Sequence, residues 1–253
     1  MDLRLFDRWC RDLLEIDALA KIDNSLNGIQ VGRRGDEIKL VAFAVDACAE
    51  AIRRAAAAGA QVLFVHHGLF WGGNARLEGP LLERVRLLLE RDLALYACHL
   101  PLDKHAEVGN NAVLARMLGL KEARSFGPYH GVELGFAGAL DPPIGLDEAV
   151  RRILPDGSRP LTLIPGSRTE IRSAAVVSGG AADNAFDALA AGIDLFVTGE
   201  SSHDVYHSMI ESGAAFLAAG HYATETWGVK AVAERLGREM GVATVFIDLP
   251  TGL

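Results

Sequence analysis

The sequence is poor in several residue types that mark large classes of proteins. It has three cysteines in 253 residues, far apart and without a CxxC pair, which indicates reduced thiols in a cytoplasmic protein. Aromatic residues make up 7% of the chain, which favours aliphatic and alanine packing over a surface that stacks bases. Basic residues number 25 against 33 acidic ones, and the formal charge of -8 disfavours a dominant contact surface for nucleic-acid phosphates.

Several kinds of segment are missing as well. The first residues mix charges of both signs and lack the apolar core of a secretory signal, and no stretch has the uncharged length of a membrane span. We therefore expect a cytoplasmic protein without a membrane partner. The patterns GxGxxG, GxSxG, the P-loop and the EF-hand are absent, so these nucleotide cradles and an elbow serine are not supported. Half of the residues are hydrophobic, which excludes a disordered chain.

Apolar runs of strand length alternate with alanine-rich helical stretches along the chain. This alternation is typical of an α/β protein with buried, mostly parallel sheets. The expected strands lie at 40–45, 62–65, 93–98, 173–177, 195–198, 214–218 and 244–247, and the expected helices at 47–58, 111–118, 181–191 and 228–236. The stretch 126–172 differs, with a strand at 132–140, a break at Pro142 and Pro143, and a helix opening near 146. It predicts a bridge between two lobes.

The two halves of the chain align with fixed offsets. An offset of 133 sets VLFVHHG at 62–68 on LFVTGES at 195–201, and an offset of 122 sets HLPLD at 99–103 on HYATE at 221–225. The alternative is a chance match between alanine-rich strand-helix units. A duplication predicts two intertwined α/β lobes with mixed, mostly parallel sheets flanked by helices, over residues 1–125 and 126–253, the C-terminal segment being free to pack back on the first lobe.

Five of the eight histidines follow predicted strands: His66, His67, His99, His105 and His221. Open α/β sheets bind ligands at the carboxyl ends of their strands, so this location favours function. The motifs at 99–103 and 221–225 each place an imidazole and a carboxylate four residues apart, on one face if the segment is helical. In the first motif, a proline makes a regular helix doubtful. For either motif alone, the alternative is an ion pair on the protein surface.

His66 and His67 pose a geometric problem, because adjacent side chains of extended backbone point to opposite faces. They can share a cavity where the chain turns at Gly68, or each can bind one of two neighbouring ions; hydrogen bonds to backbone are the plainer alternative. Imidazole and carboxylate donors without thiolate suit Zn, Fe, Mn, Co or Ni. About three histidines and two carboxylates exceed the needs of one zinc ion, so we expect a two-metal centre that activates water for hydrolysis.

Other polar residues gather near these motifs. Glu200 occupies the place of His66 and His67 in the second repeat and could line the cavity opposite them. Asn110 and Asn111 are most simply a helix N-cap. His203 and His207 lie four apart on the following helix, where a solvated helix face explains them as well as contact with substrate does. For Trp71, packing is as good an explanation as covering a ring of the substrate. The polar segment at 23–32 predicts an Asn-Gly turn capped by Asp, Asn or Ser.

Six motifs together resemble one family: DNSLNGIQVG at 23–32, VHHGLFW at 65–71, HLPLDKH at 99–105, GNNAVLA at 109–115, TGESSHDVYH at 198–207 and GHYATE at 220–225. They resemble the Nif3-like dinuclear metal centre family, also called the GTP cyclohydrolase 1 type 2 family, over essentially the whole chain. The resemblance implies the Nif3-like fold and a toroidal homohexamer whose metal sites face an internal cavity.

The resemblance also assigns residues. It implies that two divalent ions per subunit, of Zn, Fe or Mn, are bound by the ligands His66, His67, Asp103, His221 and Glu225. It places His99 beside the metals, where His99 and Glu200 are the candidates for catalytic proton transfer. One departure is Gly68, since many relatives have proline after the histidine pair; the turn is less rigid, but no ligand is lost.

The function expected from these observations is a metal-dependent hydrolase of the cyclohydrolase type acting on a small molecule, with nucleotides such as GTP among the candidates. A dinuclear-metal phosphoesterase or another small-molecule hydrolase is the first alternative. A non-enzymatic, metal-binding hexameric scaffold that binds a partner protein is the second.

Overall fold

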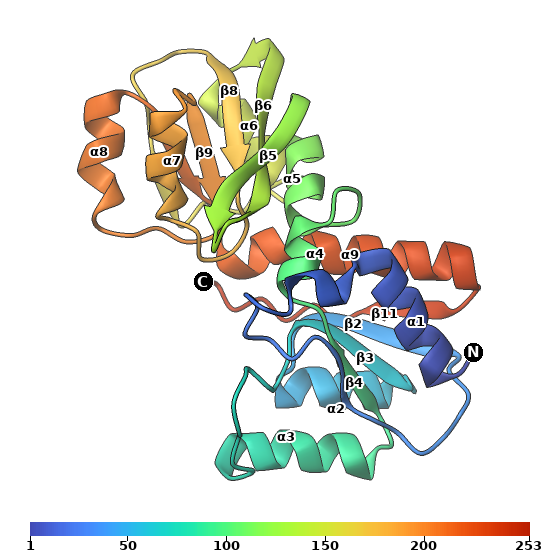
Figure 1. The fold of residues 1–253 in the computed structure, drawn as a ribbon. Helices are drawn as coiled ribbons and strands as arrows, with labels where there is room; N and C mark the ends of the chain where they lie inside the picture. Colours follow the sequence, from blue (N-terminus) through green and yellow to red (C-terminus); the bar gives the residue numbers. More distant parts are fainter. The chain divides into compact units, whose positions relative to one another are not determined.

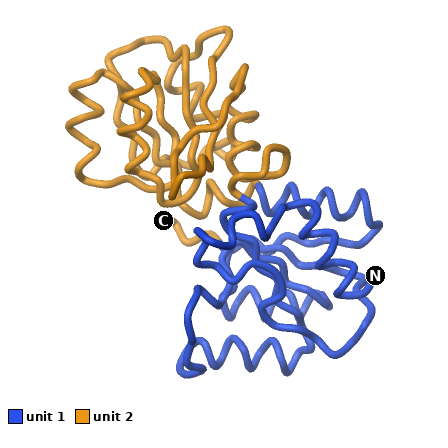
Figure 2. The backbone as a smooth tube through the Cα atoms, viewed as in Figure 1, with its two compact units in different colours: residues 1–102, 228–249 blue, residues 103–227, 250–253 orange.

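Apolar strands build two separate sheets in the computed structural model of the protein, which describes residues 1–253 (Figure 1). Residues 1–102 and 228–249 form unit 1, and residues 103–227 and 250–253 form unit 2 (Figure 2). Two of the boundaries fall inside the helices α4 (Leu100–Lys104) and α9 (His221–Met240), and the third follows the last strand. Each unit has its own mixed sheet flanked by helices, which confirms the expected α/β class. No helix is both long and apolar enough to cross a membrane.

The sheet of unit 1 has five strands in the order β1-β4-β3-β2-β11. All neighbours are parallel except β1 and β4, so four of the five strands point the same way. The strands are β1 (Gly28–Val31), β2 (Leu40–Asp46), β3 (Val62–His67), β4 (Ala94–Ala97) and β11 (Ala243–Phe246). The helices that unit 1 contains in full are α1 (Leu3–Leu14), the 3-10 helix Ile16–Leu19, α2 (Ala49–Ala57) and α3 (Gly79–Glu90).

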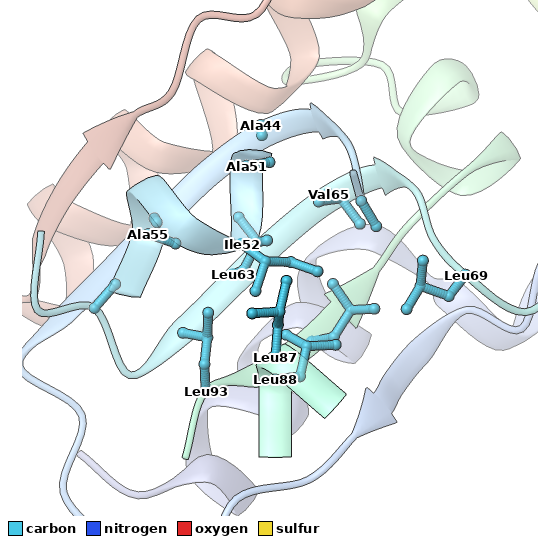
Figure 3. Packing of buried hydrophobic residues seen from close by; sticks show 14 of the residues in the cluster. Ala44, Ala51, Ile52, Ala55, Leu63, Val65, Leu69, Leu87, Leu88 and Leu93 are labelled. Carbon is cyan, nitrogen blue, oxygen red and sulfur yellow. The ribbon is translucent and has the colours of Figure 1, made fainter. Parts of the chain in front are cut away.

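Side chains of unit 1 alternate between the two faces of its sheet. Figure 3 shows Ile52 of α2, Leu63 of β3 and Leu88 of α3 packed together on one face, and all three are fully buried. On the other face Tyr96 of β4 packs edge-on against Phe6 of α1, with ring centroids 5.2 Å apart. Burial of each such side chain contributes about 2 kcal/mol, and covering both faces explains why the strands are apolar throughout.

The sheet of unit 2 has six strands in the order β5-β6-β8-β9-β10-β7, in which β8 and β9 and β9 and β10 are the parallel neighbours and the other neighbours are antiparallel. Helices α5 and α6 cover one face of it, and α7 and α8 cover the other. The strands are β5 (Lys121–Tyr129), β6 (Val132–Ile144), β7 (Thr162–Ile164), β8 (Ile171–Val176), β9 (Leu195–Thr198) and β10 (Ala215–Ala218). The helices are α5 (Asn110–Leu118), α6 (Leu146–Ile153), α7 (Asn184–Ala190) and α8 (Val205–Ser212).

The expected break at Pro142 and Pro143 is wrong. Strand β6 continues to Ile144, with a cis peptide bond between Asp141 and Pro142 and a shift of register against β8. Proline lacks the N–H that a sheet needs, so the shift at this point lets the strand continue past both prolines.

The pairing register supports the internal duplication. Val41 pairs with Val62 in unit 1, and Ala174 pairs with Leu195 in unit 2. Each residue of the second pair lies 133 positions after its counterpart in the first pair. Val62 then pairs with the first residue of β4, and Leu195 with the first residue of β10. A chance match between two strand-helix units would not preserve the pairing of three strands, because register is set separately in each sheet.

Candidate metal centre

The two adjacent histidines end the central strand of unit 1. The side chains of β3 are buried up to His66, which is fully buried, and the backbone carbonyl of His67 accepts a hydrogen bond from Ala47 at 2.9 Å. The two imidazole centroids lie 4.5 Å apart. The pair therefore gathers on one side at the very end of the strand, although both residues still belong to it.

His99 joins this pair from the neighbouring strand. It follows β4, and its backbone N–H donates to Asn27 Oδ1 at 2.8 Å. Its ring centroid lies 5.1 Å from that of His66 and 5.7 Å from that of His67. The candidate ligand atoms of the three residues all lie within 4.8 Å of one another, so unit 1 alone presents a cluster that could hold a metal ion.

Each of the three rings is held through Nδ1 by an oxygen atom. The partners are the Cys98 carbonyl for His66 at 3.0 Å, Asp46 Oδ1 for His67 at 2.9 Å and Asp23 Oδ1 for His99 at 2.9 Å. A neutral imidazole that donates from Nδ1 has its lone pair on Nε2, and this is the usual arrangement of metal-binding histidines. The donor set thus fits a divalent ion such as zinc.

Asp103 lies in α4, where Pro101 made a helix doubtful. That expectation is wrong: α4 is helical, and Pro101 is its second residue, where a missing N–H costs no helical hydrogen bond. Asp103 is 6% exposed. Its Oδ1 accepts hydrogen bonds from Asn110 Nδ2 at 2.9 Å and Ser178 Oγ at 3.0 Å, which fixes the orientation of the carboxylate.

The expectation that Asn110 and Asn111 cap α5 is also wrong. The N-cap is Gly109 without a side-chain hydrogen bond, and both asparagines are buried. Asn111 donates to the Leu134 carbonyl at 2.9 Å and accepts from the Ser178 N–H at 2.6 Å, which joins three segments of unit 2. Sequence reasoning missed this anchoring role because an asparagine pair after glycine also matches a cap.

His221 and Glu225 lie one turn apart at the start of α9, as the motif predicted. His221 Nε2 lies 3.1 Å from Glu225 Oε1, and His221 Nδ1 lies 2.5 Å from Glu200 Oε1. Burial opposes the charged form of the ring, but the two carboxylates outweigh it and raise the pKa of His221 to about 9. Unit 2 thus concentrates negative charge around one imidazole, an arrangement that favours a bound cation.

The second repeat lacks a counterpart of His66. Gly199 stands where the offset of 133 places His66, and Glu200 stands where it places His67. A Cβ on Gly199 would lie 2.7 Å from the Gly179 carbonyl and 2.8 Å from His221 Cα. No side chain fits there, so this strand end offers Glu200 alone.

The remaining histidines have other surroundings. His105 Nδ1 accepts hydrogen bonds from the N–H groups of Glu107 and Val108, both at 3.1 Å, and so orders a turn of unit 2. The expectation that His203 and His207 share a helix is wrong, because α8 begins after His203. In unit 1 the half-exposed Trp71 packs edge-on against His99, with ring centroids 4.9 Å apart.

Comparisons with known proteins agree over the whole length. The sequence model of the Duf34/NIF3 (NGG1p interacting factor 3) family matches residues 1–251. A GTP cyclohydrolase 1 type 2 homolog of Archaeoglobus fulgidus is 40% identical over 253 residues, covering 100% of both chains. One of Deinococcus radiodurans is 41% identical over 246 residues, covering 97% of this chain and 92% of its own.

Two solved structures are similar across 100% of both chains. The protein ybgI, described as of unknown function, has a TM-score of 0.91 at 32% identity. The protein TTHA1606 from Thermus thermophilus has a TM-score of 0.86 at 38% identity.

Proposed function

Because the chain belongs to the Duf34/NIF3 family, we propose that it binds two divalent metal ions and uses them to hydrolyse a small molecule, in a reaction of the cyclohydrolase type. The relatives named GTP cyclohydrolase 1 type 2 homolog make GTP the first substrate to test. The observation that carries the proposal is the cluster of three imidazoles in unit 1, each held through Nδ1 by an oxygen.

The proposed ligands are His66, His67, Asp103, His221 and Glu225. What supports this set is that its two carboxylates, Asp103 and Glu225, occupy equivalent places in the two repeats, in the helix after the third strand. A carboxylate has two oxygens, so Asp103 or Glu225 can bridge two ions. The carboxylate hydrogen bonds of Asp103 within unit 2 would keep it in one orientation.

Two bound ions would polarise the substrate and make a water molecule nucleophilic near neutral pH. The protein itself would have to move protons. Glu200 is suited to this role because its side chain is 51% exposed and already contacts Nδ1 of His221. His99 of unit 1 is the second candidate for proton transfer. Trp71 would cover one side of a bound ring.

The test starts from metal content. Elemental analysis of the purified protein should find two divalent ions per chain, with one or both lost in Glu225→Gln. The protein is then stripped, reloaded with Mn, Zn or Fe, and assayed for GTP consumption. His130→Asn is the matched control, because His130 is an exposed turn residue at positive φ, a conformation that asparagine tolerates.

The outcomes separate the alternatives. GTP consumption that needs metal and is abolished in Glu225→Gln supports the cyclohydrolase. Turnover of phosphodiesters or other nucleotides instead of GTP would replace it with a dinuclear phosphoesterase. Two bound ions without turnover of any substrate would indicate a metal-binding scaffold, and the proposed homohexamer would then be the first property to measure, by light scattering.

A further inference from the structure

Asp23 is a buried carboxylate in the loop before β1, outside the proposed ligand set. Its side chain is 1% exposed and accepts four hydrogen bonds. Oδ1 accepts from the Ser25 N–H at 2.9 Å and from His99 Nδ1 at 2.9 Å. Oδ2 accepts from Asn27 Nδ2 at 2.8 Å and from the Leu100 N–H at 3.0 Å. All four acceptor sites of the carboxylate are therefore in use.

These contacts act on His99 from two sides. Asp23 holds the ring through Nδ1 and also holds the first residue of α4, directly after His99. Three of the four contacts come from the Ser25 and Leu100 N–H groups and Asn27 Nδ2, which can only donate, so the side chain of Asp23 is held as an accepting carboxylate.

We propose that Asp23 is a positioning residue that keeps the proton of His99 on Nδ1 and thereby makes His99 a third imidazole ligand in unit 1, beside His66 and His67. This inference rests on the proposed metal binding and extends it, because it makes His99 a ligand and leaves Glu200 as the candidate for proton transfer. The geometry that carries it is the cluster of ligand atoms within 4.8 Å.

Replacing Asp23 by asparagine makes the proposal specific. If the amide oxygen stays on His99, the amide NH2 faces two donors, the Leu100 N–H and Asn27 Nδ2. If the amide turns over, its NH2 faces only one fixed donor, the Ser25 N–H, because His99 can accept at Nδ1 by moving its proton to Nε2. The second orientation has fewer conflicts, and it blocks the nitrogen that would bind metal.

Asp46 offers the matched comparison. It holds His67 Nδ1 in the same way, but its side chain is 40% exposed and His67 is its one ion-pair partner. An asparagine at 46 can turn its oxygen towards His67 without a conflict, so the proton of His67 stays on Nδ1.

The experiment reads the tautomers directly. The full-length, metal-free protein is prepared with isotope-labelled histidine, and the ring nitrogens are assigned by NMR. In the wild type His99 should carry its proton on Nδ1, and in Asp23→Asn on Nε2, whereas His67 keeps Nδ1–H in Asp46→Asn. Zinc affinity, measured by competition with a chromogenic chelator, should fall about 10–100-fold in Asp23→Asn, and less in Asp46→Asn.

Asp92→Asn controls for the loss of a loop anchor, since Asp92 also accepts backbone N–H bonds, from Arg34 at 2.7 Å and Gly35 at 3.0 Å. It should leave zinc affinity unchanged. An unchanged tautomer in Asp23→Asn, or an equal loss of affinity in Asp92→Asn, overturns the proposal. His99→Ala keeps Asp23 and is the second variant: full zinc affinity there overturns it as well. The tautomer of His99 is measured without metal and without turnover. An absence of hydrolysis therefore refutes the proposed function, whereas the NMR result decides the role of Asp23 independently.

Discussion

Gly199→Ala tests whether the second repeat has room for a side chain at the position of His66. The new methyl group would meet three atoms closer than 3.0 Å: the Gly179 carbonyl, His221 Cα and Thr224 Oγ1. Two of them are backbone atoms. Thr224 is fully buried and its hydroxyl accepts from the Gly179 N–H at 3.0 Å, so it cannot move aside either. The substitution therefore has to shift the backbone.

The cost follows from these contacts. Overpacking of this kind destabilises by about 1–3 kcal/mol. Gly199 also donates to the Gly179 carbonyl and accepts from the Gly220 N–H, both at 2.9 Å, and losing one of these bonds adds about 1 kcal/mol. We expect a total near 3 kcal/mol, which lowers the Tm of the protein by roughly 6–12 °C for a chain of this size.

The assay is urea and thermal unfolding followed by circular dichroism, with Gly32→Ala as the control. Gly32 has open space around its Cα and no positive φ, so alanine should not lower the unfolding free energy and should raise it by about 0.4–1 kcal/mol. Gly199→Ala as stable as Gly32→Ala would refute the packing argument and with it the explanation for the missing imidazole.

Three further predictions concern groups that are buried for structural reasons. Asn111→Ala leaves a carbonyl and an N–H unpaired in unit 2 and should cost about 3 kcal/mol in urea unfolding; a loss below about 1 kcal/mol would mean that water replaces the amide. Burial raises the pKa of Tyr96, so its phenol ionises only in the unfolded chain and stability falls as pH rises above the usual value of 10.0. Tyr96→Phe should flatten this alkaline loss of stability, and an unchanged pH profile contradicts the assignment. Iodoacetamide should modify Cys48 in the native protein, whereas Cys10, whose pKa burial raises, should react only after unfolding; early labelling of Cys10 would show that its site opens.

The buried strands were predictable from the sequence because both of their faces are covered. Strands β2, β3, β9 and β10 have continuous apolar runs, and their expected positions are confirmed within a few residues. Strand β5 was not predicted, since it is an edge strand with most of its residues exposed and pairs only with β6. Helix α3 was also missed: Leu82 and Leu89 are exposed, so its leucines do not mark one buried face.

The site could be predicted only in part, for a similar reason. A histidine at a strand end is visible in the sequence, because apolar residues precede it. Its outer partner is not, because the hydrogen bond between Asp23 and His99 joins residues 76 apart and depends on how the loop packs in unit 1. The segment 23–32 contains two of the four donors to Asp23, the Ser25 N–H and Asn27 Nδ2, whereas the other two come from His99 and Leu100.

Duplication and divergence together explain why the proposed ligands are unequal between the repeats. The first repeat keeps two imidazoles at its strand end, whereas the second has glycine and Glu200 there, since His221 Cα and the Gly179 carbonyl occupy the space of a side chain. After the third strand, both repeats keep an imidazole and a carboxylate four residues apart: His99 and Asp103 in the first, and His221 and Glu225 in the second. The second repeat has the carboxylate of Glu200 where the first has the imidazole of His67, and this carboxylate raises the negative charge around His221. The proposed ligands of unit 1 are imidazoles and those of unit 2 include both carboxylates, so we expect the two proposed ions to differ in affinity. Stepwise loss of metal to a chelator, with one ion released well before the other, is the behaviour that this asymmetry requires.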